Sequence, residues 1–344
     1  IFHAFEILLK NLNICRNLEK SIYNFAIFCK SFIIKVMSKI DKIDELQNIL
    51  KEDRTNFQAR RQLAVLLLDF GYAEEAKQHL LYLSKIFPDD SGIFYNLGIT
   101  YEKLKKLDKA EMAYNKAIEL APDEIDAYYN LGLVFIDKKQ FEKAIDCFET
   151  VLQKDNNDSN AYFSIGLCYF KEGKLDGAKY YFQRTVELND EDIYAHFYIG
   201  NILKSQGDNE GAREKFYKVL ELSPDYSWAY FNLASIDYEE GNFDSAINNL
   251  DKTLELNPKD VEAYKIYSKI LTKARKYDNA AVLIEQAIDN CGDNGDLYYF
   301  LAQIQKIRGD VEEYIKCMNN ALKFNISLSV APKLVKKELD EFLK

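Results

Sequence analysis

Apolar and small side chains recur every 34 residues (132 − 98 = 34) from Phe57 to Leu328. This is the interval that separates Gly98, Gly132, Gly166 and Gly200. Within one such period, Ser91 to Glu124, the apolar positions fall on two faces at helical spacing, and a short polar turn separates the two stretches. The pattern therefore predicts eight repeats over 57–328, each made of two amphipathic helices. It predicts sixteen helices in all, and no sheet.

Each repeat also has two positions that are held by small residues. The first helices carry Ala64, Gly98, Gly132, Gly166, Gly200, Ala234, Ser268 and Ala302. The second helices carry Ala76, Ala110, Ala144, Ala178, Ala212, Ala246 and Ala280. Only a small side chain lets two helices approach closely, so we expect these positions at helix contacts. We expect Gly166 to lie at a contact between neighbouring repeats.

Proline and glycine mark the ends of the predicted helices. The second helices are stopped by Pro88, Pro122, Pro224 and Pro258, because proline lacks the backbone donor and its ring clashes with the preceding turn. The turns inside the repeats carry Gly71, Gly173, Gly207, Gly241 and Gly309, where a positive φ ends the first helix.

This alternation of small and large residues resembles the tetratricopeptide repeat family over residues 57–328. The resemblance implies an all-α fold in which helix-turn-helix repeats stack into a right-handed superhelical solenoid, with the first helices lining an inner groove. It implies no single ligand, since the family serves many functions.

The ends of the array differ from its middle. The last repeat is degenerate, because Tyr314 replaces the expected alanine and Gln305 replaces a large apolar residue. Beyond it, residues 329–344 predict a capping helix that starts at Pro332 and shields the last apolar face. Residues 37–56 predict an N-terminal helix or half repeat.

Residues 1–36 are apolar and precede Met37, the first methionine. One interpretation is upstream sequence that was read through, with Met37 as the true start. The other is an interfacial membrane anchor, since Lys30 interrupts the run that a spanning helix needs. We expect a cytoplasmic protein, with attachment to the membrane periphery as the alternative if this segment is genuine.

Charge and composition exclude several function classes. A net charge of -10 argues against a nucleic-acid partner, which selects clustered Lys and Arg. The six cysteines and three histidines show no metal-ligand or catalytic spacing, and we expect His196 to be a packing residue. We therefore expect no enzyme activity, no cofactor, no metal and no small-molecule substrate.

The residues that point into the groove are the candidates for specificity. A large side chain recurs on the inner face of the first helices as Tyr95, Tyr129, Phe163, Phe197, Phe231 and Tyr299. We call these six residues the aromatic ladder. An apolar strip beside it consists of Leu133, Ile136, Leu167 and Phe170, and Trp228 adds to the aromatic surface. The alternatives are the family's ordinary preference for rings and coverage of the strip by the chain's own termini.

Polar groups next to the ladder extend this hypothesis. Asn96, Asn130 and Asn232 follow ladder positions, where related proteins use asparagine to bind a peptide backbone. Lys265, Lys269 and Lys273 stand at i, i+4 steps on one helix face and predict a basic stretch of groove that holds an acidic group of the peptide. A solvated lysine face without a ligand is the alternative.

One residue departs from the repeat. Asp237 stands where other repeats carry Tyr101, Phe135 or Tyr169. We expect it to be exposed through local repacking, and a functional charge is the alternative.

The sequence favours a non-catalytic scaffold or adaptor that binds a protein or peptide in its groove. A membrane-anchored assembly factor that recruits envelope proteins through the same groove, and the targeting arm of a larger enzyme, are the alternatives.

Overall fold

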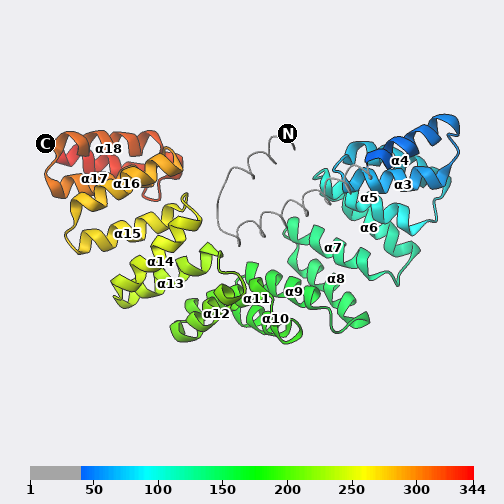
Figure 1. The fold of residues 1–344 in the computed structure, drawn as a ribbon, viewed down its shortest axis with the longest axis horizontal. Helices are drawn as coiled ribbons and strands as arrows, with labels where there is room; N and C mark the ends of the chain where they lie inside the picture. Colours follow the sequence, from blue (N-terminus) through cyan, green and yellow to red (C-terminus); the bar gives the residue numbers. More distant parts are fainter. Residues whose placement is uncertain (1–39) are drawn as a thin grey trace, which may run out of the picture. The chain divides into compact units, whose positions relative to one another are not determined.

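The computed structural model describes residues 40–344, and these form an all-α protein in which no strand occurs. The interpretations of residues 1–36 lie outside the described residues. The chain divides into two compact units, with the boundary between Asn156 and Asn157. Figure 1 labels the helices of both units. Each unit is described by itself, as the N-terminal and the C-terminal unit.

The N-terminal unit consists of antiparallel helix pairs. Residues 40–52 are helical and bury Ile43, Leu46 and Leu50. The helices that follow are α3 Phe57–Asp69, α4 Ala73–Ile86, α5 Ser91–Lys103, α6 Leu107–Leu120, α7 Ile125–Asp137 and α8 Phe141–Lys154. Each odd-numbered helix packs on the next even-numbered one.

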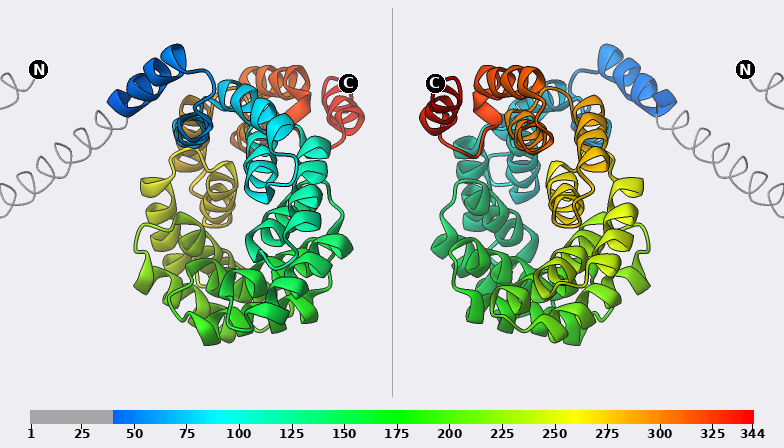
Figure 2. Two further views of the ribbon diagram at one scale, coloured as in Figure 1. Left: turned by 90° about the vertical axis from the view of Figure 1, so that its right-hand side faces the viewer. Right: turned by 90° about the vertical axis from the view of Figure 1, so that its left-hand side faces the viewer.

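The C-terminal unit continues the same alternation. Its helices are α9 Ser159–Lys171, α10 Leu175–Leu188, α11 Ile193–Ser205, α12 Asn209–Leu222, α13 Ser227–Glu240, α14 Phe243–Leu256, α15 Val261–Lys273, α16 Tyr277–Cys291, α17 Gly295–Arg308, α18 Val311–Lys323, the 3-10 helix η1 Asn325–Ser327 and α19 Pro332–Phe342. The sixteen helices α3 to α18 confirm the number that the repeat pattern predicts. Helix α19 lies against α18 (Figure 2). It buries Val335 and Leu339.

Polar side chains at a repeated position start several of the first helices. The carboxylates of Asp90, Asp158, Asp192 and Asp260 accept hydrogen bonds from backbone N–H groups three residues later, at 2.8–3.3 Å. This is the N-cap arrangement that satisfies a helix's unpaired first donors. The capping position lies between repeats, so these four aspartates fix where their repeats begin.

The turns inside the repeats require a left-handed backbone conformation. All five glycines predicted to adopt a positive φ do so, at 75–83°. Lys105, Lys139 and Arg275 occupy the same turn position in other repeats, at 56–59°. The turn geometry is therefore kept even where the glycine is not.

The contact made by the small residues of the first helices differs from our prediction. A Cβ on Gly166 would stand 2.9 Å from the ring of Phe182, which belongs to the second helix of the same repeat. Gly98, Gly132 and Gly200 face Tyr114, Phe148 and Phe216 in the same way. Gly166 therefore lies at a contact within its repeat, and the prediction of a contact between neighbouring repeats was wrong.

The prediction for Asp237 was also wrong, because its side chain is buried with only 2% of its surface exposed. Arg213 of α12 forms an ion pair with it at 2.7 Å. Ser245 and Asn249 of α14 donate hydrogen bonds to its other oxygen at 2.7 and 2.9 Å. The carboxylate thus connects α12, α13 and α14, and its burial is compensated by these partners.

Candidate functional site

The rings of the aromatic ladder are half-buried, because most of them pack against the second helix of their own repeat. The ring centroids of Tyr95 and Tyr114 lie 6.0 Å apart, and those of Phe163 and Phe182 lie 5.4 Å apart. The pairs Tyr129–Phe148 and Phe197–Phe216 repeat this contact at 5.3 and 6.0 Å. The ladder therefore contributes to packing as well as to the surface.

In the C-terminal unit, Tyr198 packs between a residue of the apolar strip and a ring of the second helix. Its ring stacks on Phe182 at 5.0 Å and meets Phe170 edge to face, also at 5.0 Å. Burial raises the pKa of Tyr198 above its ordinary value. Leu167 in this unit, and Leu133 in the N-terminal unit, are half-buried on their first helices. Truncating one of these side chains would remove core contacts as well as any ligand contact.

Trp228 is the most exposed of the proposed aromatic contacts. Half of its surface, 52%, is exposed, and its ring lies edge to face with Phe231 at 6.3 Å. An indole in this setting offers a large apolar contact area.

The three asparagines already use their amide groups inside the chain. Asn96 donates to the carbonyl of Gly92 at 2.8 Å, and Asn130 donates to the Tyr95 hydroxyl at 3.0 Å. Asn232 donates to the carbonyl of Trp228 and accepts a hydrogen bond from a lysine, Lys204. A peptide backbone would have to share these groups.

Lys265 is buried, with 9% of its surface exposed, and does not present a free charge. Its Nζ lies 2.8 Å from Glu262 and 3.0 Å from Asp296 of α17. Burial would lower the pKa of Lys265, but these hydrogen bonds outweigh it and raise the pKa above its ordinary value. The expectation of three free lysines on one face is therefore wrong for Lys265, because α17 supplies a carboxylate.

A cavity of about 290 Å³ opens beside the other two lysines. It lies on three consecutive first helices of the C-terminal unit, with Tyr238 from α13, Lys269 and Lys273 from α15, and Phe300 and Ile307 from α17. We call it the lysine pocket. Its other lining residues are Ser268, Thr272, Tyr299, Gln303 and Ile304. The sequence hypothesis included Lys269, Lys273 and the ladder residue Tyr299. It missed the walls formed by Tyr238, Phe300 and Ile307.

The lysine pocket combines apolar walls with two cations. The Nζ of Lys269 lies 5.6 Å from the centre of the Phe300 ring, and that of Lys273 lies 4.5 Å from the centre of the Tyr238 ring. Within the described part of the chain, neither ammonium group has an acidic partner within 4 Å. The pocket can therefore take an apolar side chain together with a carboxylate.

The C-terminal helix places a carboxylate against α17. Glu338 of α19 accepts hydrogen bonds from Tyr299, Gln303 and Lys306 at 3.0–3.1 Å. Burial would raise the pKa of Glu338, but these donors hold it below its ordinary value. Tyr299 and Gln303, which also line the lysine pocket, are thereby fixed in position.

Three cysteines and one histidine of the described residues are buried inside the fold. Burial raises the pKa of the Cys147, Cys168 and Cys317 thiols to about 12, which keeps them protonated. His196 is buried, with Nε2 at 2.9 Å from the carbonyl of Asp190. Across residues 40–344, no three His, Cys, Asp or Glu side chains gather as metal ligands. None of the helices in this range is both long and apolar enough to cross a membrane.

Solved structures with this fold were found in several organisms. A tetratricopeptide repeat protein from Parabacteroides merdae covers 74% of this chain and 99% of its own, with 16% identity and a TM-score of 0.55. The pilF protein of Pseudomonas aeruginosa covers 63% of this chain and 97% of its own, with 19% identity and a TM-score of 0.54. A chain of the Cut9–Hcn1 hetero-tetramer of the APC/C covers 77% of this chain and 52% of its own length, with 17% identity and a TM-score of 0.53. These likenesses concern the fold alone.

Sequence comparisons agree with the helix pairs. Among curated protein sequences, none matches the chain. Sequence models of the tetratricopeptide repeat match residues 92–124, 125–158, 169–227 and 203–270, in both units. Together with the sixteen regularly spaced, paired helices, these matches show that the chain belongs to the tetratricopeptide repeat family.

Proposed function

We propose that the protein is a non-catalytic interaction scaffold that binds a peptide segment of a partner protein on the first helices of its C-terminal unit. The lysine pocket receives an apolar side chain between Tyr238 and Phe300. Lys269 and Lys273 bind a carboxylate next to that side chain, either an acidic residue or the peptide's own C-terminus.

The observation that carries this proposal is the contrast between three lysines on one helix. Lys265 is buried and paired with two carboxylates, whereas Lys269 and Lys273 are exposed beside an apolar cavity. Two like charges at i, i+4 repel one another by a few tenths of a kcal/mol, so an anion between them is favourable. An apolar wall next to the anion adds contact area and specificity.

Peptide display on the full chain tests the proposal. We expect selection from a random library with free C-termini to enrich an apolar residue beside a carboxylate. The enriched peptides should bind Lys269→Glu/Lys273→Glu at least ~10-fold more weakly, since the charge that holds the carboxylate is reversed.

The matched control is Lys333→Glu/Lys336→Glu, which makes the same charge change on the exposed face of α19. This variant should retain nearly all affinity. Equal losses in the two double variants would show a general charge effect, and equal affinity of the wild type and Lys269→Glu/Lys273→Glu would reject the lysine pocket as the site.

A further inference from the structure

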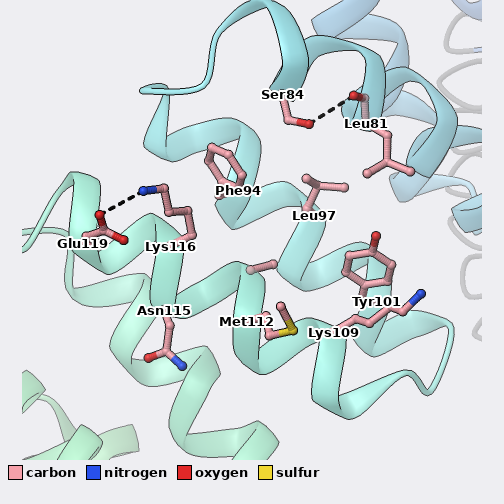
Figure 3. Close-up of a pocket in the computed structure, with 11 residues that line it drawn as sticks. Leu81, Ser84, Phe94, Leu97, Tyr101, Lys109, Met112, Asn115, Lys116 and Glu119 are labelled. Atoms are coloured by element: carbon pink, nitrogen blue, oxygen red, sulfur yellow. Dashed lines mark hydrogen bonds and ion pairs between the residues drawn. The ribbon is translucent and has the colours of Figure 1, made fainter.

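A larger cavity, of about 770 Å³, lies in the N-terminal unit between the second helices α4 and α6 (Figure 3). Phe94, Leu97 and Tyr101 of α5 form its floor. Leu81 and Ser84 come from α4, and Met112 and Ala113 come from α6. We call it the outer groove. It uses second helices as its walls, whereas the lysine pocket is built from first helices alone.

The outer groove exists because a repeated apolar side chain is missing. Ser84 stands where the other seven repeats carry Ile118, Leu152, Val186, Leu220, Leu254, Ile288 and Leu322. In the C-terminal unit these side chains are partly buried and pack against the core. Ser84 instead turns its hydroxyl to the carbonyl of Leu81 at 3.1 Å, which leaves the space above α5 open (Figure 3).

The wall that α6 forms on the other side of the outer groove also carries a small side chain. Ala113 occupies the position that carries His79, Cys147, Tyr181, Lys215, Asn249, Leu283 and Cys317 in the other repeats. It is the smallest of the eight side chains, so α6 adds little to the space that Ser84 leaves open. Two independent positions thus widen the same groove.

The mouth of the outer groove is apolar where most repeats are polar. Met112 is 73% exposed and Leu81 is 37% exposed. The position of Leu81 carries Asn115, Glu149, Gln183, Tyr217, Asp251, Glu285 and Asn319 in the other repeats. Apolar side chains that surround an open apolar groove are typical of a protein-binding surface.

The charges at the rim favour an acidic partner. Lys116 and Glu119 neutralise each other at 2.9 Å. Lys109 stands at the Tyr101 end, 5.8 Å from the centre of that ring, and among the described residues it has no acidic partner within 4 Å. The rim therefore carries one uncompensated positive charge, in a chain whose net charge is negative.

We propose that the outer groove binds an amphipathic helix of a partner protein, with apolar side chains in the groove and an acidic residue against Lys109. The floor from Phe94 to Tyr101 extends over about two turns of α5, roughly 10 Å at 1.5 Å per residue. This length matches about two turns of an incoming helix, whose apolar residues at i, i+4 and i+7 would enter the groove.

A peptide library tests this proposal. The probe is a displayed library of helical peptides of about 16 residues, with leucine fixed at i, i+4 and i+7 and other positions random. Selection uses the full chain, with an excess of soluble Ser84→Leu protein as competitor. We expect enriched peptides to bind the wild type, to bind Ser84→Ala equally well, and to lose at least ~10-fold in affinity for Ser84→Leu, because leucine fills the groove.

Charge reversal tests the orientation of the peptide. Lys109→Glu should weaken binding several-fold, and a peptide in which its acidic residue is changed to lysine should restore it. Ser84→Leu is expected to fold, since leucine occupies this position in other repeats. Should circular dichroism show that it is unfolded, Met112→Glu, at an exposed position, takes its place as the blocking variant.

Three outcomes would overturn the proposal. One is an enriched pool that binds the blocking variant as tightly as the wild type. Another is that no peptide is enriched on the wild type when the Ser84→Leu competitor is present. Peptides that bind without an acidic residue and are insensitive to Lys109→Glu would reject the assigned partner chemistry.

Discussion

No space is left between Gly166 of α9 and Phe182 of α10. A Cβ on Gly166 would stand 2.9 Å from both Cδ1 and Cε1 of the ring, closer than side-chain atoms approach. The ring of Phe163 packs on Phe182 from the neighbouring side at 5.4 Å. A glycine on the first helix, an aromatic ring on the second and a ladder ring thus form one packing group.

The first prediction concerns this packing group. Gly166→Leu should lower the free energy of unfolding by roughly 2–4 kcal/mol, because overpacking displaces Phe182 from the core. Urea denaturation measures the change. Gly166→Ala should cost less, and Gly166→Ala/Phe182→Leu should show positive coupling in a double-mutant cycle. Additive effects of the two substitutions would contradict the contact.

The second prediction concerns the ion pair between Arg213 and Asp237. Arg213→Met leaves the buried carboxylate without its cation and should cost about 3–5 kcal/mol of stability. Arg213→Met/Asp237→Leu should recover most of that loss, since Leu203 and Leu271 occupy the position of Asp237 in other repeats. An equally large loss in the double variant would show that the carboxylate was not the cause.

The helices and turns could be predicted from the sequence for a physical reason. A helix pair is fixed by contacts within one repeat, and the small, large and turn positions that make those contacts recur. The glycine turns could therefore be predicted. The start of α19 at Pro332 could be predicted for another reason, because proline fits the first position of a helix, where no backbone donor is needed. The asparagines and the ladder rings could be placed on the first helices, but their internal partners could not be read from the pattern.

The wrong predictions fall where a side chain departs from the repeat. Asp237 is buried because Arg213 lies on the preceding helix and pairs with it. The repeat pattern predicts no particular residue type at the position of Arg213. Lys265 is buried because Asp296, on the first helix of the next repeat, accepts its charge. The outer groove was missed because its signal is an absent apolar side chain at Ser84, away from the positions where small residues recur.

The third prediction concerns pH. Asp296 is buried, which would raise its pKa, but hydrogen bonds from Ser329 and Lys265 hold the pKa below its ordinary value. Such a carboxylate stabilises the fold above its unfolded-state pKa of about 4, and this contribution is lost as the pH falls through the lower folded-state pKa. We call the difference in the free energy of unfolding between the wild type and Asp296→Asn the stability gap. This gap should therefore be largest near pH 7 and become smaller below about pH 4.

Chemical denaturation at several pH values measures this gap. Asp340→Asn on the exposed face of α19 is the control and should show little gap at any pH. A gap for Asp296→Asn that stays constant down to acidic pH would contradict the role of the ionised carboxylate in this contact.

The fourth prediction concerns the turns. Lys105 adopts a φ of 56° at the turn position that Gly71 and Gly173 hold elsewhere. A left-handed conformation costs a residue with a Cβ about 1–2 kcal/mol, a cost that glycine avoids. Glycine also has more conformational freedom in the unfolded state, which offsets about 0.5–1 kcal/mol of that gain in folding stability. Lys105→Gly should therefore stabilise the protein by about 0.5–1 kcal/mol. The reciprocal Gly173→Lys should destabilise it by a similar amount, and a rise in the melting temperature of that variant would contradict the strain.

Peptide binding in the lysine pocket can be tested by photo-cross-linking. A peptide enriched on the wild type carries benzoylphenylalanine at its apolar position, and mass spectrometry locates the adduct after irradiation. We expect adducts on the walls of the pocket, at Tyr238, Phe300 or Ile307, and their loss in Lys269→Glu/Lys273→Glu. Adducts confined to second helices or to the N-terminal unit, unchanged in that variant, would show that the peptide binds elsewhere.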